Sequence, residues 1–156
     1  MNQKLSDLAS IAEIISGVAV VATLIFLIVG IRENTEVTRA AAYGGIVTAL
    51  NDIGTTIAQD EALAGIWQSY RAGDSEELSD DEEFRLRTLL RNVWRVYEWA
   101  YYSNQYDTLG SAEWDRFESA ICANRGNSEQ AQWTYIESIL TEEFSAYIGR
   151  NCRDDR

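Results

Sequence analysis

Residues Ile14–Ile31 read IISGVAVVATLIFLIVGI, eighteen residues without a charged side chain between Glu13 and Arg32. At about 1.5 Å per residue, a helix of this length spans roughly 27 Å, which matches the hydrocarbon thickness of a bilayer. The stretch therefore predicts a transmembrane helix within an N-terminal anchor at residues 1–33.

Two other interpretations of this stretch stay open. A cleaved secretory signal would fit the A-x-A pattern in Ala40-Ala41-Ala42, although the apolar stretch is longer than a usual signal core and charged residues precede the alanines. A buried core helix would need more surrounding chain than this small protein provides. We expect a retained, single-pass anchor.

The remainder of the chain is acidic. From Arg32 onward the sequence carries 12 basic and 23 acidic side chains, a net charge of −11. Such a surface repels nucleic acid and anionic lipid headgroups, so nucleic acid is excluded as a partner. Residues 34–156 are enough for one acidic helical domain, and the span is able to continue as a helix into it through about residue 58.

Helical periodicity and the absence of proline predict an all-α domain, a small extramembrane helical bundle. Gly44-Gly45 marks a point where the first helix could break. Ser79 and Glu82 match a capping box that starts a helix running to about Asn104. Three further helices are expected. One covers residues 61–70, and a second begins at the cap Ser111 and ends at the polar run 124–127. The last helix begins at the cap Ser128 and ends at Gly149.

Several short motifs follow one another along the chain. They are Ile31-Arg32-Glu33-Asn34-Thr35, Leu78-Ser79-Asp80-Asp81-Glu82, Glu98-Trp99-Ala100-Tyr101-Tyr102, Gly110 with Trp114, and Trp133. In this order they resemble an uncharacterised family of small bacterial membrane proteins with a single span ending in I-R-x-N-T and a C-terminal helical domain. The resemblance implies a location in the bacterial inner membrane and no particular activity.

One side of the predicted span carries small and hydroxyl residues at 3-4 spacing. We call this stripe the seam; its members are Glu13, Ser16, Val20, Thr23, Leu27 and Gly30. Small residues permit close contact between membrane helices, so the seam predicts a homo-oligomer surrounded by membrane lipid. The alternatives are that the hydroxyls only bond their own helix, or that Glu13 stands at the mouth of a cation channel.

Two further groups lie on the capped helix. The arginine ladder, Arg87, Arg91 and Arg95, is spaced to pair with acidic residues within or between subunits, or to bind an anion. Aromatic residues spread over more than one helix face predict an interface with a neighbour or with the membrane surface, the alternative being a core role. The aromatic set is Trp94, Trp99, Tyr101 and Tyr102.

The membrane side of the domain is left open. Lys4 and the terminal amine flank the span on one side and Arg32 and Arg39 on the other, a count that favours a cytoplasmic C-terminal domain. Cys122 and Cys152 would form a disulfide in an exported domain and stay reduced in the cytoplasm. Their spacing indicates no metal site.

No histidine, nucleophile motif or phosphate-binding loop is present, so we expect no catalytic residue, no metal and no cofactor. The sequence predicts a non-enzymatic, membrane-anchored assembly subunit, with another membrane complex as a further possible partner. A cation channel and a membrane-tethered ligand-sensing domain, with a pocket beside the arginine ladder, are the alternatives.

Overall fold

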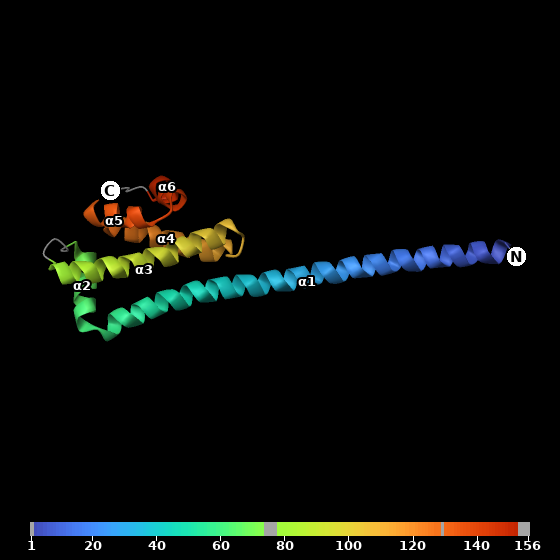
Figure 1. Ribbon diagram of the computed structural model, residues 1–156, viewed down its shortest axis with the longest axis horizontal. Helices are drawn as coiled ribbons and strands as arrows, with labels where there is room; N and C mark the ends of the chain where they lie inside the picture. Colours follow the sequence, from blue (N-terminus) through green and yellow to red (C-terminus); the bar gives the residue numbers. More distant parts are fainter. Residues whose placement is uncertain (1, 74–77, 129, 153–156) are drawn as a thin grey trace. The chain divides into compact units, whose positions relative to one another are not determined.

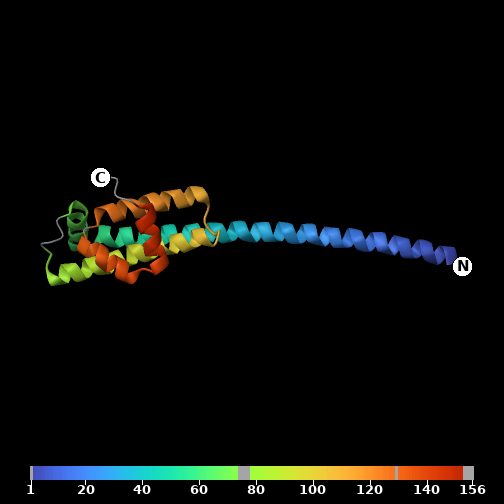
Figure 2. The same cartoon turned by 90° about the horizontal axis from the view of Figure 1, so that it is seen from above.

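The computed structural model describes residues 2–73, 78–128 and 130–152, with side chains from Ser16 onward except at 127, 130 and 131. Within these residues every regular element is an α-helix, which confirms the predicted all-α class. Figures 1 and 2 show α1 (Asn2–Gln59), α2 (Glu61–Ala72), α3 (Asp80–Gln105), α4 (Ser111–Asn127), α5 (Gln130–Ile139) and α6 (Glu142–Asn151).

The chain divides between Thr38 and Arg39 into two units. Gly44 and Gly45 do not break α1, which continues to Gln59. Each glycine costs a helix about 1 kcal/mol relative to alanine. Apolar side chains on both sides of the pair offset this cost, because Ile46 is completely buried and Tyr43 and Leu50 pack against the same core.

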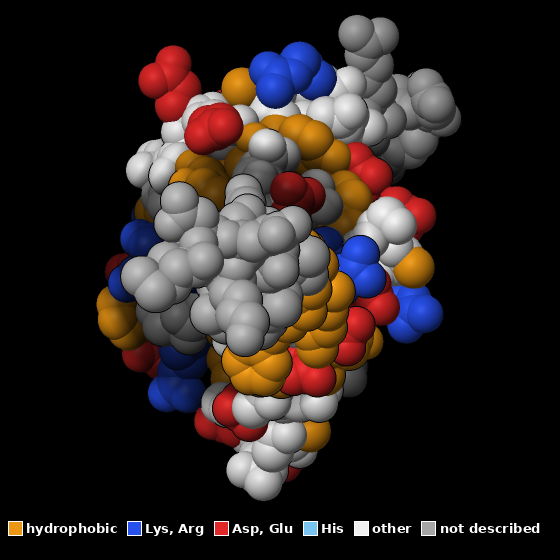
Figure 3. All heavy atoms as spheres, turned by 90° about the vertical axis from the view of Figure 1, so that its right-hand side faces the viewer, with side chains coloured by type: hydrophobic (Ala, Val, Ile, Leu, Met, Phe, Trp, Pro, Cys, Tyr) orange, Lys and Arg blue, Asp and Glu red, His pale blue; other side chains and the backbone are white. Residues whose placement is uncertain are grey.

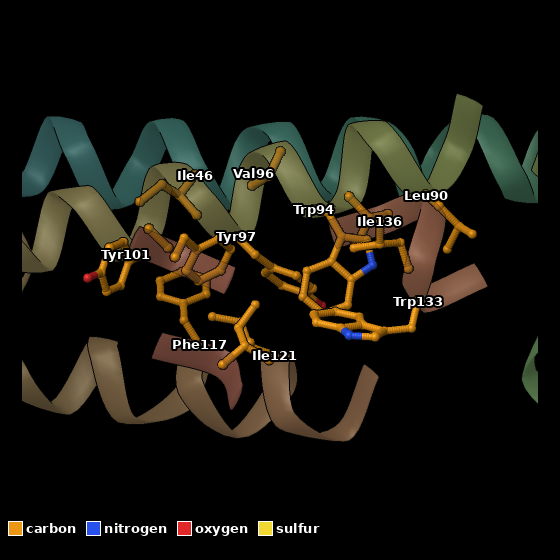
Figure 4. Close-up of a cluster of buried hydrophobic side chains, with 14 of the residues drawn as sticks. Ile46, Leu90, Trp94, Val96, Tyr97, Tyr101, Phe117, Ile121, Trp133 and Ile136 are labelled. Carbon is orange, nitrogen blue, oxygen red and sulfur yellow. The ribbon is translucent and has the colours of Figure 1, made fainter. Parts of the chain in front are cut away.

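Helix α3 is the central element of the second unit, since it contacts α2, α4 and α5. Its inner side buries Leu90 and Trp94. In Figure 4 the Trp94 indole faces that of Trp133 from α5, and their ring centroids lie 5.6 Å apart. Ile121 of α4 and Ile46 of α1 extend the same cluster. With Tyr70 of α2 and Phe144 of α6 in the same cluster, one core joins all six described helices.

The start of α3 has the predicted capping box. The Glu82 amide approaches the Ser79 hydroxyl, and the Ser79 amide donates to the Glu82 carboxylate over 2.9 Å. Hydrogen bonds from the Ser79 side chain and backbone hold the pKa of Glu82 below its ordinary value. The reciprocal bonds satisfy amides that a helix start otherwise leaves unpaired.

The prediction of one continuous last helix is wrong, because α5 ends at Ile139 and α6 begins after Thr141. The Thr141 amide and hydroxyl donate to the buried Glu98 carboxylate over 2.7 and 2.8 Å. This contact with α3 replaces the hydrogen bond that would continue the helix. The chain turns here, and Gly149 lies inside α6 instead of ending it.

Two of the helix caps in the structure also differ from those that the sequence predicts. Gly110 is the N-cap of α4, and Ser111 is the first helical residue. Ser128 closes α4 instead of opening the next helix. Its hydroxyl lies 2.7 Å from the Tyr70 hydroxyl and donates to the Asn124 carbonyl over 2.9 Å, so this serine joins α2 to α4.

Candidate functional site

The first candidate site is the apolar part of α1. Among the described residues, Ser16–Gln59 is the one helical segment long and apolar enough to cross a membrane, with a mean hydropathy of 1.9 over its best window. None of that window is buried, and every described side chain from Ser16 to Ala41 is exposed. A core helix of a soluble protein would be covered by its own chain. Two interpretations of this segment remain, a membrane anchor and a signal sequence.

The described part of the seam lies on one exposed side of this helix. Ser16, Val20, Thr23, Leu27 and Gly30 are all exposed. The Thr23 hydroxyl donates to the Ala19 carbonyl over 2.9 Å, so it is already satisfied within its own helix. Close packing, and not a hydrogen bond from Thr23, is what this surface offers a neighbour. The side chain of Glu13 lies outside the described residues.

A second surface on the span was not expected from the sequence. A shallow hollow of about 520 Å³ is lined by Gly17, Val18, Val21, Ala22 and Ile25. At 100° per residue these positions fall on the side of the helix opposite the seam. The signal in the sequence is the pair of small residues Gly17 and Ala22 between branched neighbours. The span thus has two faces on which another helix could pack.

The arginine ladder does not act as one cluster. Arg87 pairs with Glu83 of its own helix over 2.6 Å, and its guanidinium lies 5.2 Å from the centre of the Tyr135 ring. Arg91 donates to the Tyr135 hydroxyl over 3.3 Å. Arg95 is exposed. Tyr135 of α5 therefore contacts two of the three ladder residues, Arg87 and Arg91.

The aromatic set separates into core and surface. Trp94 is 0% and Tyr101 is 3% exposed, so both are core residues and not part of an interface. Tyr102 is half-buried, and its hydroxyl donates to Thr141 over 2.9 Å. Trp99 is 44% exposed. Two more exposed aromatic residues accompany Trp99: Tyr106, the C-cap of α3, and Phe84, which the sequence did not single out.

Trp99 also covers Gly45 of α1. A Cβ atom at Gly45 would lie 2.6 Å from Cη2 of the Trp99 indole, whereas a Cβ at Gly44 would meet nothing within 4 Å. A rigid indole cannot bend away, so we expect Gly45→Ala to destabilise the domain by about 1–3 kcal/mol through overpacking.

Gly44→Ala is the matched control, because it adds the same methyl group to open space and should stabilise α1 by about 0.5–1 kcal/mol. Thermal unfolding of the full-length protein in mild detergent, followed by circular dichroism, compares the two variants. Equal melting temperatures would show that Trp99 does not pack on Gly45.

A pocket lies where α1, α2 and α3 meet. It has a volume of about 220 Å³ and is lined by Thr56, Asp60, Leu63, Phe84, Arg85, Thr88, Leu89 and Asn92. Asp60 already accepts the Leu63 amide as the N-cap of α2, and Arg85 pairs with Asp81 over 2.9 Å. None of the three ladder arginines lines this pocket.

The pKa values of two tyrosines are raised, and these shifts do not suit the two side chains to acid–base catalysis. Burial raises the pKa of Tyr97 to about 12. Burial and the hydrogen bond from Tyr147 to Glu118 raise the pKa of the Tyr147 hydroxyl well above its ordinary value. A general acid or base works best near the ambient pH, and both shifts move away from neutrality. Among the described residues no group of acidic or sulfur side chains could hold a metal ion.

The two cysteines form a disulfide. Cys122 lies in α4 and Cys152 is the C-cap of α6, and their Cα atoms are 4.8 Å apart.

Comparisons with models of protein families, with curated proteins and with solved structures gave no match.

Proposed function

We propose that this protein is a non-enzymatic, membrane-anchored assembly subunit of the bacterial inner membrane that self-associates through the seam of its span. The observation that carries the proposal is that every described side chain of the apolar part of α1 is exposed. An apolar helix without cover from its own chain is stable in lipid or against other helices. The seam supplies the small residues that such contacts need.

The helical domain supports the same role. On the face drawn in Figure 3, acidic and basic side chains lie interspersed. Exposed Trp99 of α3 and Tyr106, the C-cap of α3, are side chains of the kind that protein interfaces favour. We propose that these aromatics, with exposed Arg95, form a second contact between neighbouring subunits.

Leucine substitutions in the span test the self-association. Ser16→Leu with Thr23→Leu fills the seam with bulky side chains, so we expect the oligomer to dissociate at a protein concentration about tenfold higher, equivalent to about 1.4 kcal/mol. Native mass spectrometry of the full-length protein in mild detergent measures the oligomeric mass across a dilution series.

Gly17→Leu with Ala22→Leu is the matched control, since it makes a similar change on the opposite side of the same helix. The proposal predicts that this variant keeps the wild-type mass. Dissociation of the control alone would assign the contact to the hollow and refute the seam. If neither variant changes the mass, or if the wild type is a monomer, the span does not drive assembly.

A further inference from the structure

The disulfide bears on the side of the membrane that the domain occupies. Cys122 and Cys152 are the only cysteines of the chain, 30 positions apart, and both are half-buried. Their bond joins the middle of α4 to the end of α6. Protein disulfides form and persist in oxidising compartments, and they are rare in a cytosol that glutathione and thioredoxin keep reduced. A structural disulfide therefore indicates an extracytoplasmic domain.

The charges beside the span do not oppose this reading strongly. The flanks differ by a single basic side chain, Lys4 on one side against Arg32 and Arg39 on the other. Acidic residues contribute little to the positive-inside rule, and long domains cross the membrane largely regardless of their charge. The difference of one basic side chain favours a cytoplasmic domain only weakly, and a disulfide between the only two cysteines outweighs it.

We infer that the helical domain lies on the extracytoplasmic face of the membrane and that the chain is a substrate of a thiol–disulfide oxidoreductase there. In the reaction, the thiolate of one cysteine attacks the oxidoreductase disulfide to give a mixed disulfide. The second thiolate then resolves it. The two protein thiols lose two electrons and two protons in total, and the oxidoreductase disulfide gains them to become a dithiol. The inference rests on the proposed membrane anchor.

Thiol labelling of the full-length chain in intact spheroplasts tests the inference. The reagent is a membrane-impermeant polyethylene-glycol maleimide, which adds a visible mass to each free thiol. We expect no mass shift without reduction, and a shift of two labels after treatment with a membrane-impermeant phosphine. In cells that lack the extracytoplasmic thiol oxidase, we expect labelling without the phosphine.

The single variants Cys122→Ser and Cys152→Ser report on accessibility. Each leaves one free thiol, which should react in intact spheroplasts without reduction if the domain lies outside. Reaction only after lysis would place the domain in the cytoplasm and overturn the inference. Unchanged oxidation in cells without the thiol oxidase would overturn the assignment of that partner.

Extraction of the membranes with alkaline carbonate separates failure of the inference from failure of the anchor. A chain that stays with the membrane but labels only after lysis is anchored with its domain inside. A shorter chain released from the membrane has lost its N-terminal segment, which would refute the anchor while leaving export of the domain intact.

Discussion

Replacement of Trp94 with alanine is expected to lower the free energy of unfolding by about 3–5 kcal/mol, the usual cost of truncating a buried tryptophan. Trp94 is 0% exposed, and its ring packs at 5.6 Å against both Tyr97 and Trp133. Alanine would leave a cavity between α3 and α5, lined by rings too large to close it. Denaturant unfolding of the full-length protein in mild detergent, followed by near-ultraviolet circular dichroism, measures the loss.

Trp99→Ala is the matched control, the same change on the same helix at a side chain that is 44% exposed. Its cost should be less than half that of Trp94→Ala, because much less apolar surface returns to water. Similar losses for the two variants would contradict the placement of Trp94 at the centre of the core.

Trp94→Phe separates volume from polarity at the same position. Among the described residues, the Trp94 Nε1 atom is buried without a hydrogen-bond partner. A buried donor without an acceptor costs about 1–3 kcal/mol, and phenylalanine removes that donor while keeping an aromatic ring. This variant should therefore lose clearly less stability than Trp94→Ala.

Local signals in the sequence were sufficient for much of the fold. The capping box at Ser79 and Glu82 depends on residues three positions apart, and it forms as predicted. The apolar positions of α1 beyond the span, such as Ile46 and Leu50, follow a helical period and pack on the core. Neighbouring residues determine such features, so their spacing along the chain reveals them.

Features that depend on distant residues were missed. The break between α5 and α6 is due to Glu98, which is 43 positions away from Thr141. Periodicity alone predicts one continuous helix there, because the apolar stripe from Trp133 to Ile148 is uninterrupted. Likewise, aromatic density on α3 could not separate the buried Trp94 and Tyr101 from the exposed Trp99, since the position of each neighbouring helix decides their burial.

Loss of the disulfide is the other large effect that we expect. Cys122 and Cys152 are separated by 30 positions, and closing a loop of this length is worth about 3.6 kcal/mol in the chain-entropy model, with 2–4 kcal/mol typical of measured cases. The variant Cys122→Ser with Cys152→Ser should lose stability by that amount. Thermal unfolding of the full-length protein in detergent, with and without a reductant, measures it.

The reductant supplies the control within the same experiment. It should lower the melting temperature of the wild type to that of the double variant and leave the variant unchanged. The folded structure itself should persist, because Phe144 and Ile148 are completely buried and Glu98 still holds the start of α6. A wild type that is indifferent to the reductant would show that the bond between α4 and α6 contributes nothing to stability. If the near-ultraviolet spectrum collapses at low temperature on reduction, the apolar contacts of α6 are too weak to hold it without the covalent link.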